Sequence, residues 1–415
     1  MRIPRHNAES YRAALDYLFP RTTQIKFGLD TTRHLLEVAG DPQRQFATVH
    51  VGGTNGKGSV ATLLAEALGT TGARVGLYTS PHLVSFRERI RVDGAPISRE
   101  AVVAWTRHLE PTMEQTGATF FEATTAIAFA DFAARGVDIA VVEVGLGGRL
   151  DSTNVLDPLV SVVTRIALDH QRYLGDTLEQ IAVEKAGIAK PGVPFVIGEA
   201  DPALAAVLER AGAAAVGGGR YCPVRVDPAA EWSGALGLAG PHQRRNAAVA
   251  AAVLAELPAS MRPDGGGIAL GFATARVPGR LDRRGRWLFD VAHNPDGMAA
   301  LVAALQAEPP RGPVHALVSI LADKPWPDML VQLDRVVDLG ILTVTPTAEG
   351  RKWDTAWLER WLADPSRPPA RARWRLIPDF ESALREVETG AGTILVTGSF
   401  HTVGDVMQSR GVRVE

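Results

Sequence analysis

A glycine-rich stretch that carries a lysine and a serine is the strongest chemical signal in this sequence. Residues 46–59 read FATVHVGGTNGKGS, in which an apolar run breaks into a glycine turn with Lys57 and Ser59, and the helix-like run SVATLLAEAL follows. Converging backbone amides, the positive end of a helix and the Lys57 ammonium together suit a triphosphate. We therefore predict a cradle for a nucleoside triphosphate here.

The spelling departs from the commoner phosphate-loop pattern G-x-x-x-x-G-K-[ST] at two positions. Val51 stands where the first glycine would be, and Gly58 separates Lys57 from Ser59. A plain glycine turn between a strand and a helix is the alternative, although a lysine and a serine are superfluous in such a turn. The variant spelling is similar to the one used in the Mur ligase superfamily.

Glu143 lies inside the apolar run IAVVEVGL, near the end of a predicted buried strand at 137–145. A lone carboxylate in such a run is costly unless it is ionised against a cation. Magnesium bound to ATP is the obvious cation, because it favours hard oxygen ligands. A carboxylate exposed at the edge of the strand is the alternative.

Further reactive side chains follow other predicted strands. Ser80 and His82 come after one strand, and Asp169 and His170 come after another. Ligands of open parallel sheets bind beyond the carboxyl ends of the strands, so we expect these side chains near the cradle. For His170 taken alone, an ordinary core or surface histidine is the favoured interpretation.

Lys185 lies beside Glu184 in TLEQIAVEKAGIAKPG, on a predicted helix at 177–190. By spacing alone, a solvated ion pair between the two side chains is the favoured interpretation. A role for Lys185 at the phosphate site therefore needs another argument.

Short, valine-rich apolar runs alternate with helical patterns along the chain. This rhythm predicts an α/β fold with a wound, mostly parallel sheet in an N-terminal P-loop-type ATPase domain. The rhythm restarts near residue 275, which predicts a smaller Rossmann-like C-terminal α/β domain. We expect the domains at 1–275 and 276–415, a hinge region at 258–285 and a weak surface loop at 213–223. The predicted strands lie at 46–51, 74–79, 137–145, 159–164 and 194–198, and then at 286–292, 313–320, 340–345, 373–377 and 392–398.

Length and composition limit the class of protein. A chain of 415 residues exceeds the usual size of a single core, which favours two domains. The 44 basic and 46 acidic residues give a net charge of −2, so no global field would recruit nucleic acid or anionic lipid. The single cysteine, Cys222, excludes an internal disulfide and fits a reducing compartment. With no signal-peptide core and no membrane-spanning run, we expect a cytoplasmic protein, and the composition fits a monomer.

A set of segments together resembles the folylpolyglutamate synthase/dihydrofolate synthase family, a branch of the Mur ligases. Each segment is suggestive, whereas the ordered set is highly specific and covers nearly the whole chain. The segments run in one order from about residue 27 to residue 407: FGLDTTRHLLEVAGDPQ, HVGGTNGKGS, YTSPHLVSFRERIRV, FEATTAIAFA, EVGLGGRLDSTN, ALDHQRYLGDTLEQIAVEKAGIAKPG, GPHQRRNAAVA, VPGRLD, DVAHNPDG and TGSFHTVGDVM.

The resemblance implies an ATP- and magnesium-dependent amide ligase that adds L-glutamate to dihydropteroate or to reduced folates. In such enzymes the folate-side carboxylate attacks the γ-phosphate to give an acyl phosphate, and the glutamate amine then displaces phosphate. Phosphorylation turns a poor acyl donor into a good one, while metal and lysine spread the developing charge. Two magnesium sites are implied, and a need for potassium is left open.

The resemblance also implies roles at the phosphate end. Lys57 corresponds to the phosphate-binding lysine. Ser80 and Glu143 correspond to ligands of one magnesium, and His170 to a ligand of the other. Lys185 corresponds to a lysine that becomes carbamylated in this family, which would turn a cation into an anionic oxygen ligand and override the ion-pair interpretation. The surrounding cradle positions, the last of which also faces the metal, are Gly53, Thr54, Asn55, Gly56, Gly58 and Ser59.

Other roles implied by the resemblance concern the nucleotide, the pterin and the glutamate. Because most nucleotide-contacting positions lie in the second domain or at its edge, the two domains should close around ATP and exclude water. Phe121 could stack on the pterin ring and Asp151 could accept its N–H groups, with core packing as the alternative for Phe121. The nucleotide positions are Asn246, Arg280, Asp290 and His293. The substrate positions are His82, Thr119, Phe121, Asp151, Ser152, His293 and Ser399.

Two departures and two rival functions remain. Gly52 replaces a usual alanine and Gln171 follows the Asp–His pair where threonine or methionine is commoner, so the choice between one activity and two stays open. A Mur-type ligase acting on another carboxylate, such as a peptidoglycan precursor, would need a UDP-sugar-binding domain, for which we expect no room before the cradle. A GTPase switch would carry an Asn/Thr-Lys-x-Asp motif, and the nearest string is ADKP at 322–325.

Overall fold

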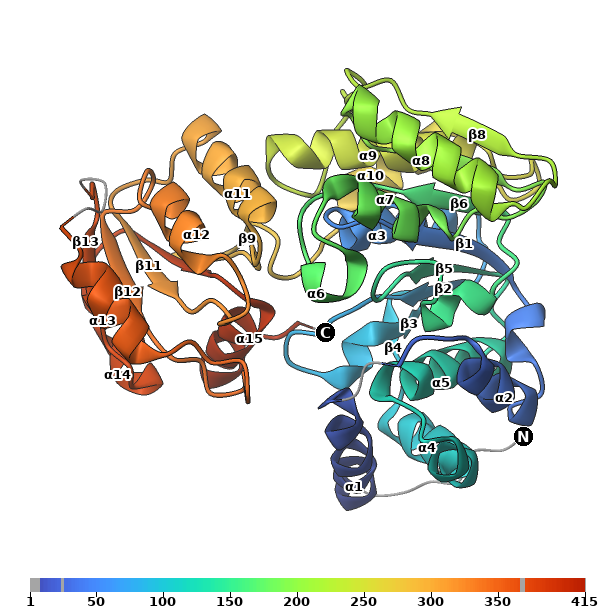
Figure 1. Ribbon diagram of the computed structural model, residues 1–415, viewed down its shortest axis with the longest axis horizontal. Coiled ribbons are helices and arrows are strands. Elements are labelled where there is room, and N and C mark those ends of the chain that lie inside the picture. Colours follow the sequence, from blue (N-terminus) through green and yellow to red (C-terminus); the bar gives the residue numbers. More distant parts are fainter. Residues whose placement is uncertain (1–7, 24–25, 366–369, 415) are drawn as a thin grey trace.

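The chain forms two β-sheets that lie in separate lobes, with helices on both faces of each sheet (Figure 1). The computed structural model describes residues 8–23, 26–365 and 370–414. This arrangement confirms the predicted α/β class with a larger N-terminal and a smaller C-terminal unit.

The first sheet has the strand order β4-β3-β2-β5-β1-β6-β7-β8. Neighbouring strands are parallel, except that β3 runs antiparallel to β2 and to β4 at one edge. The carboxyl ends of β5, β1 and β6 therefore lie side by side at the centre of one edge of the sheet. The strands are β1 (Ala47–Gly52), β2 (Val75–Tyr78), β3 (Ile90–Val92), β4 (Ala95–Pro96), β5 (Ile139–Glu143), β6 (Val160–Val163), β7 (Pro194–Ile197) and β8 (Cys222–Arg225).

Alternate residues of these strands face opposite layers of helices, as the two-residue period of a strand requires. Val49, Val51 and Val141 face a core beneath α3 (Lys57–Gly69), α9 (Pro241–Ala255) and α10 (Gly265–Thr274). Ala140 and Val142 face the opposite core. The helices of that side are α1 (Ala8–Leu18), α2 (Asp30–Val38), α4 (Arg99–Thr116) and α5 (Phe120–Ala134), and further along the sheet α6 (Gln171–Leu174), α7 (Leu178–Ala186) and α8 (Pro202–Ala215). Short 3-10 turns lie in the connections of this lobe: η1 (Phe19–Thr23), η2 (Pro42–Arg44), η3 (Phe86–Arg89) and η4 (Ser152–Val155).

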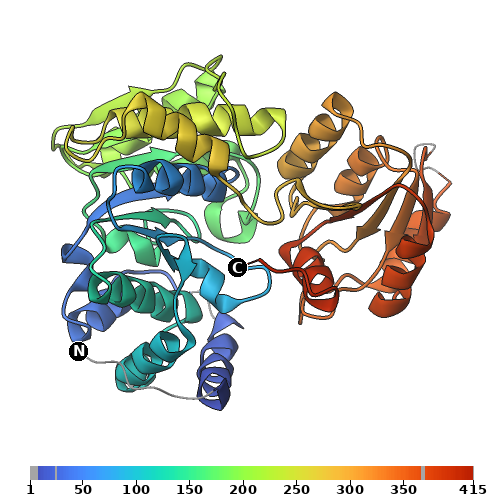
Figure 2. The same ribbon diagram turned by 180° about the vertical axis from the view of Figure 1, so that it is seen from behind.

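The second sheet has the order β13-β12-β11-β14-β10-β9, parallel except for the pair β10–β9. Its strands are β9 (Asp282–Arg284), β10 (Trp287–Phe289), β11 (Val314–Val318), β12 (Leu339–Leu342), β13 (Arg373–Leu376) and β14 (Thr393–Thr397). One face packs on α11 (Pro295–Ala307), α12 (Trp326–Leu333) and α13 (Thr355–Ala363), and the other on α14 (Phe380–Thr389) and α15 (Phe400–Ser409). Figure 2 shows both layers from behind.

Every predicted strand is present, but two connecting segments differ from expectation. The stretch 213–223 is more ordered than a surface loop, because α8 continues to Ala215 and β8 begins at Cys222. The stretch 258–285 is not one hinge, because α10 packs on α3 of the first lobe and β9 already pairs in the second sheet. The connection between the lobes is therefore shorter, from Thr274 to Asp282, and the proposed domain boundary at 275/276 falls within it. In the described parts of the chain, no helix has both the length and the apolar character needed to cross a membrane.

The close contact between α10 and α3 matters because α3 carries the glycine cradle at its start. A Cβ atom at Gly271 would lie 2.5 Å from Cα of Ala67 in α3. We predict that Gly271→Ala forces the helices apart and lowers the free energy of unfolding by about 1–3 kcal/mol, measured from the midpoint of urea unfolding. Gly265→Ala, in the same helix where a Cβ meets nothing within 4 Å, is the control and should be neutral or stabilising. Equal losses from both substitutions would contradict the prediction.

Candidate active site

The glycine cradle connects the end of β1 to the start of α3. Gly53 (φ 135°) and Gly56 (φ 90°) adopt conformations that favour glycine. A Cβ atom would also lie 2.0 Å from Thr164 Oγ1 at Gly53, and 2.6 Å from Asn246 Oδ1 at Gly56. No side chain caps the start of α3, so its first amides are free to bind an anion. Sterics and conformation therefore both require glycine at positions 53 and 56.

Glu143 ends β5 directly beside β1, where it pairs in register with Val51. Its side chain is buried, one carboxylate oxygen accepts a hydrogen bond from the Ser80 amide at 3.0 Å, and the other lies 4.0 Å from Lys57 Nζ. Burial raises the pKa of Glu143, and the Lys57 ammonium opposes this shift. The exposed-edge alternative is wrong. Cradle and carboxylate meet at the carboxyl edge of the sheet, as the sequence predicted.

The oxygen donors near Glu143 suit a hard divalent cation such as magnesium. Ser59 is buried in the first turn of α3, and Ser80 follows β2. Within the described ranges, no cluster of three or more His, Cys, Asp or Glu side chains is placed to hold a metal ion. A carboxylate and two hydroxyl groups fit an ion that keeps several waters and takes further oxygens from a nucleotide.

Lys185 is buried beneath the cradle. Its Nζ donates a hydrogen bond to the Gly53 carbonyl at 2.9 Å. Glu184 instead pairs with Arg149 at 2.9 Å, so the solvated ion pair that spacing alone favoured is wrong. Burial, together with nearby Lys57, lowers the pKa of Lys185 to about 7. A substantial share of the amine is thus uncharged at neutral pH.

Asp169 is a buried meeting point between the lobes. Its carboxylate accepts hydrogen bonds from Lys324 Nζ and, at 3.2 Å, from Asn294 Nδ2, and it lies 3.4 Å from His293 Nε2. Burial opposes ionisation, yet the hydrogen bond from His293 and the nearby cations hold the pKa of Asp169 well below its usual range. Three side chains of the second lobe therefore converge on one carboxylate of the first.

His170, next in the chain, is less enclosed, with 40% of its side chain exposed. Burial lowers its pKa to about 4, so the imidazole is neutral and free to act as a ligand.

A second bridge between the lobes starts at the cradle. Asn55 exchanges hydrogen bonds with the amide of Asn294 and donates to Asp296 at 2.7 Å, and Arg165 pairs with the same Asp296 at 2.9 Å. The sequence prediction did not single out Asn294, Asp296 or Arg165. The signal for Asn294 and Asp296 was the polar run DVAHNPDG directly after β10, at the carboxyl edge of the second sheet, whereas Arg165 follows β6 of the first sheet.

The other nucleotide positions lie on both sides of this junction. Asn246 in α9 packs against Gly56 of the cradle. The Arg280 guanidinium lies 5.4 Å from the centre of the Phe400 ring, and both Asp290 and Glu143 raise its pKa against the effect of burial. The Asp290 carboxylate accepts hydrogen bonds from the backbone amides of Leu281 and Ala292. A nucleotide held at these positions would span the two lobes.

Comparisons with known proteins agree with this geometry. Residues 51–221 match the Mur ligase middle domain, and residues 279–400 match the Mur ligase glutamate ligase domain. The folylpolyglutamate synthase of Lacticaseibacillus casei is 36% identical over 414 residues, which cover 90% of this chain and 92% of that protein. The chain belongs to the folylpolyglutamate synthase/dihydrofolate synthase family.

Two solved structures of this family superpose closely. Escherichia coli FolC in complex with DHPP and ADP has a TM-score of 0.84 and 31% identity, covering 99% of this chain and 100% of that chain. A bifunctional folylpolyglutamate synthase/dihydrofolate synthase with Mn, AMPPNP and L-glutamate bound has a TM-score of 0.82 and 32% identity, covering 99% and 100%. Both lobes of this chain therefore have the family's arrangement.

Some predicted substrate residues of this family member use their polar atoms to cap helices. Thr119 caps α5, where its hydroxyl donates to the Glu122 carboxylate at 2.9 Å and accepts from the Glu122 amide. Ser399 caps α15 in the same manner, through the amide and hydroxyl of Thr402. Their substrate roles stay predictions. Each hydroxyl oxygen keeps a second lone pair, with which it could accept a hydrogen bond from a ligand while the cap stays in place.

Asp151 is also engaged. One carboxylate oxygen accepts the amide and hydroxyl of Thr153, and the other accepts the amides of Gly145 and Leu146 at 3.1 and 2.8 Å. Burial raises the pKa of Asp151, and these hydrogen bonds oppose that shift. Asp151 therefore holds the loop after β5, while Ser152 is buried at the start of η4. Contact of either residue with a pterin stays a prediction.

Phe121 and His82 lie on the α5 side of the sheet. Phe121 is half-buried, with its ring 6.0 Å from that of Tyr78 and against the backbone of Gly145. His82 Nδ1 accepts a hydrogen bond from Arg89 Nε at 2.8 Å. An aromatic ring that is partly open and lies beside a glycine lets a flat ligand stack on it, whereas a ring enclosed in a core does not.

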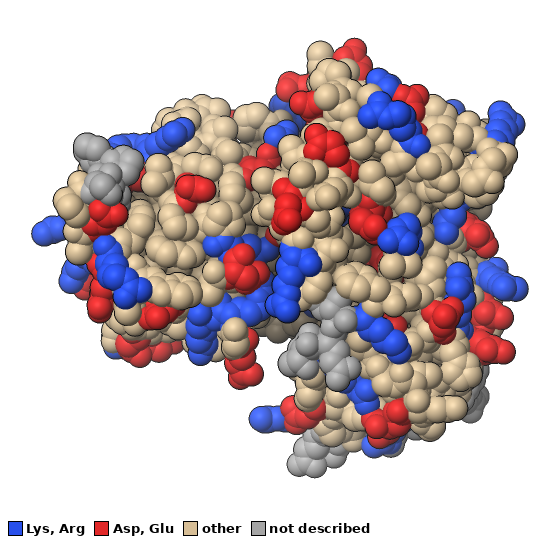
Figure 3. Space-filling model, viewed as in Figure 1, with Lys and Arg blue, Asp and Glu red and all other residues tan. Residues whose placement is uncertain are grey.

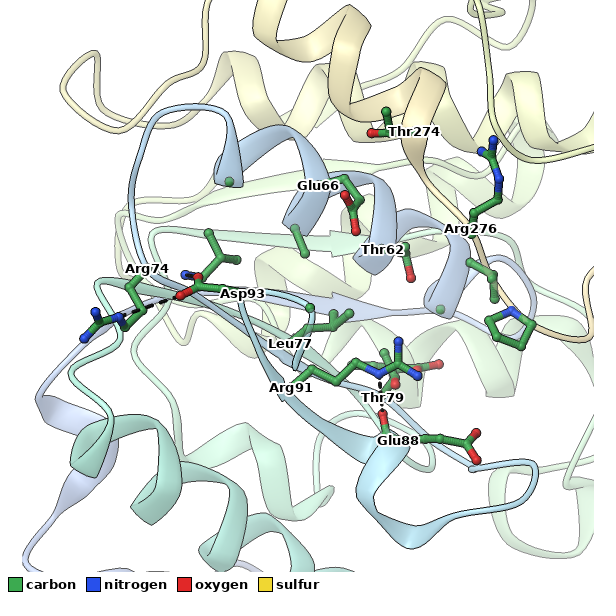
Figure 4. Close-up of a pocket in the computed structure, with 18 of the residues that line it drawn as sticks. Thr62, Glu66, Arg74, Leu77, Thr79, Glu88, Arg91, Asp93, Thr274 and Arg276 are labelled. Carbon is green, nitrogen blue, oxygen red and sulfur yellow. Dashed lines mark hydrogen bonds and ion pairs between the residues drawn. The ribbon is translucent and has the colours of Figure 1, made fainter. Parts of the chain in front are cut away.

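A groove of about 950 Å³ opens beside Glu143 on the α3 side (Figure 4). It begins at Gly58 and Glu143 and runs along α3 past Glu66, with Arg91 and Arg276 on opposite walls. On the face shown in Figure 3, basic side chains gather in the hollow between the lobes. The surroundings of the site therefore favour anionic ligands, although the net charge of the chain is only −2.

The ion pair of Asp169 with Lys324 should control how the lobes associate. We predict that Asp169→Asn leaves Lys324 buried without a counter-ion and weakens the free energy of contact between the lobes by about 3–5 kcal/mol. The radius of gyration measured by small-angle X-ray scattering should then increase. The control is Asp323→Asn, which breaks an exposed pair with Arg351 and should cost less than about 1 kcal/mol. An unchanged radius of gyration for Asp169→Asn would show that other contacts hold the lobes together.

Proposed function

We propose that this chain is an ATP- and magnesium-dependent ligase that adds L-glutamate to dihydropteroate and also to reduced folates. The observation that carries the proposal is the 4.0 Å approach of Lys57 Nζ to the buried Glu143 carboxylate at the mouth of the glycine cradle. The ligands named for two relatives, DHPP with ADP in one and Mn, AMPPNP and L-glutamate in the other, support the same substrate classes here.

At the phosphate end, each group has a distinct task. The first amides of α3 and the Lys57 ammonium would bind the phosphates, and Thr54, Gly58 and the other loop residues shape that cradle. Glu143, with the hydroxyls of Ser59 and Ser80, would hold one magnesium ion, and His170 with a carbamate on Lys185 would hold a second. When bound, the metal neutralises charge on the transferring phosphoryl group.

The reaction that fits these groups has two steps. A carboxylate oxygen of the pteroate or folate attacks the γ-phosphorus, the bond to the ADP oxygen breaks, and an acyl phosphate forms. The glutamate amine then attacks the acyl carbon, loses a proton, and inorganic phosphate leaves. Lys57 stabilises negative charge in the first step. His293 and Ser399 lie at the second lobe's edge of the site, where glutamate would enter.

The second lobe completes the nucleotide site in this proposal. Asn246 and Arg280 would contact the nucleotide from the junction, and Asp290 and His293 from the end of β10. The contacts of Asn294 and Asp296 with the cradle keep this junction closed, which would protect the acyl phosphate from water. The domains proposed at 1–275 and 276–415 are the units that open and close.

The range of substrates is the finer part of the proposal. One relative is named for folylpolyglutamate synthesis alone and another for both activities, so a chain that only extends folates is the alternative. The half-open Phe121 ring favours a bare pteroate as an additional substrate. We also propose a cytoplasmic monomer that binds neither nucleic acid nor membrane, because Cys222 is free and the net charge is −2.

A coupled assay tests the proposed function directly. Purified chain with ATP and magnesium should release ADP and phosphate only when L-glutamate is present with either dihydropteroate or a reduced folate. Mass analysis of the products separates the two activities, because each product gains one glutamate residue. ATP hydrolysis that is indifferent to the pteridine would contradict the proposal, and a glutamate adduct on folate alone would favour the single-activity alternative.

Lys185 offers a separate test of the carbamate. We predict that Lys185→Ala lowers kcat by at least about 100-fold, because an anionic ligand is lost, and that short carboxylic acids such as acetate partly restore the rate. Glu184→Ala, which removes only the partly exposed pair with Arg149, should keep most of the activity and show no rescue. Full activity in Lys185→Ala would exclude the carbamate.

A further inference from the structure

Arg89 is a buried cation that the reaction described above does not use. It ends η3 directly before β3, and its backbone carbonyl accepts the Thr79 amide at 3.0 Å. Only 8% of the residue is exposed to solvent. This pairing places Arg89 at the carboxyl edge of β2, the same edge at which Glu143 ends β5.

The guanidinium of Arg89 is only partly satisfied. Its Nε donates to His82 Nδ1 at 2.8 Å, and its Cζ lies 5.1 Å from the centre of the Phe120 ring. In the described parts of the chain, no carboxylate lies within 4.0 Å of it, and its terminal nitrogens have no hydrogen-bond acceptor. Among the described residues, the N–H groups of the two terminal nitrogens therefore have no acceptor.

The nearest carboxylates cannot neutralise this cation. Glu88 uses both oxygens to accept the amides of Leu83, Val84 and Ser85. Glu143 is close enough to raise the pKa of Arg89 against the effect of burial, but it makes no direct contact. A buried guanidinium that keeps its charge without a counter-ion is costly, and an anionic ligand with two oxygens would relieve that cost.

The position of Arg89 indicates which anion this is. Arg89 packs with Phe120 on the α5 side of the sheet, where the half-buried Phe121 ring contacts Tyr78. Glu143, which is near enough to act on the charge of Arg89, adjoins the cradle for the phosphates. A ligand with its flat ring on Phe121 and its far end at the γ-phosphate would pass Arg89 close to that far end.

We propose that Arg89 binds the reacting carboxylate of the pteroate or folate through its terminal nitrogens and so aims that carboxylate at the γ-phosphate. This inference rests on the proposed function and adds to it a residue for the carboxylate. His82 contributes by accepting from Nε, which leaves the two terminal nitrogens directed at the ligand. A planar fork of donors matches a carboxylate in two hydrogen bonds, which a lysine cannot reproduce.

The test compares dihydropteroate with its primary amide, in which the charged group is replaced by a neutral one of similar shape. Affinities are measured by equilibrium titration in the presence of AMPPNP and magnesium for the wild-type chain, Arg89→Gln, Arg89→Lys and Arg91→Gln. Arg91 is the matched control, since it lies two residues further along β3 and donates to the Glu88 and Val414 carbonyls.

The wild type and Arg91→Gln should prefer the acid over the amide by about 10- to 100-fold, the range for charge-assisted hydrogen bonds. Arg89→Gln should bind the two compounds equally, with its affinity for the amide unchanged, and Arg89→Lys should keep only part of the preference. In turnover, Arg89→Gln should raise KM for dihydropteroate and leave KM for ATP unchanged.

Each other outcome is decisive. A preference for the acid that survives in Arg89→Gln would overturn the inference. If Arg89→Gln lost affinity for the amide as well, Arg89 would shape the pocket instead of binding the carboxylate, and the inference would also be wrong. A wild-type chain that binds neither compound would contradict the proposed substrate class itself, whereas failure of Arg89→Gln alone leaves that class intact.

Discussion

The meeting of Glu143 with Lys57 is the constraint on which the site depends. It arises because β5 and β1 are parallel neighbours, so the carboxylate at the end of one strand and the glycine loop at the end of the other reach the same edge. Lys57 Nζ lies 4.0 Å from the Glu143 carboxylate and also donates a hydrogen bond to the Thr54 carbonyl. The lysine therefore only partly compensates the charge of Glu143, whose pKa is raised by burial. A divalent cation together with a polyanion would complete the balance of charge at this edge.

Charged groups without full partners recur around this edge. Arg89 and Arg280 are buried cations whose pKa burial lowers, and neither has a carboxylate within ion-pair distance in the described part of the chain. By contrast, Asp169 has more cationic and polar partners than one charge needs. The unpaired cations surround the space where anionic ligands would lie, and the saturated carboxylate joins the lobes. Buried charges that lack an ion partner thus mark groups that would bind ligands, and the fully paired Asp169 marks a group that holds the structure together.

The sequence predicted the fold well because both faces of the central strands are buried. Such strands read as short valine-rich runs, and each one was found in the structure. The cradle and Glu143 were also predictable, since a lysine in a glycine turn and a carboxylate in an apolar run are unusual locally. The pair of Asp169 and Lys324 was not predictable, because 155 residues separate the partners and the position of Asp169 after a strand does not indicate which cation it meets. The burial of Lys185 likewise depends on where α7 docks, which helical spacing does not determine.

Family motifs also hide a distinction between contacting a ligand and shaping its pocket. Asp151 accepts the hydroxyl of Thr153, which is itself bonded to His50 at 2.8 Å, so a buried chain of polar groups fixes the loop after β5. That loop begins at Gly145, against which the Phe121 ring lies. Changing Asp151 would therefore move the surface under the ring even if the carboxylate touched no ligand. The choice between a bare pteroate and a longer folate then depends on the space around Phe121 more than on the presence of the motif residues. For this reason the motifs identify the family more readily than they identify the range of its substrates.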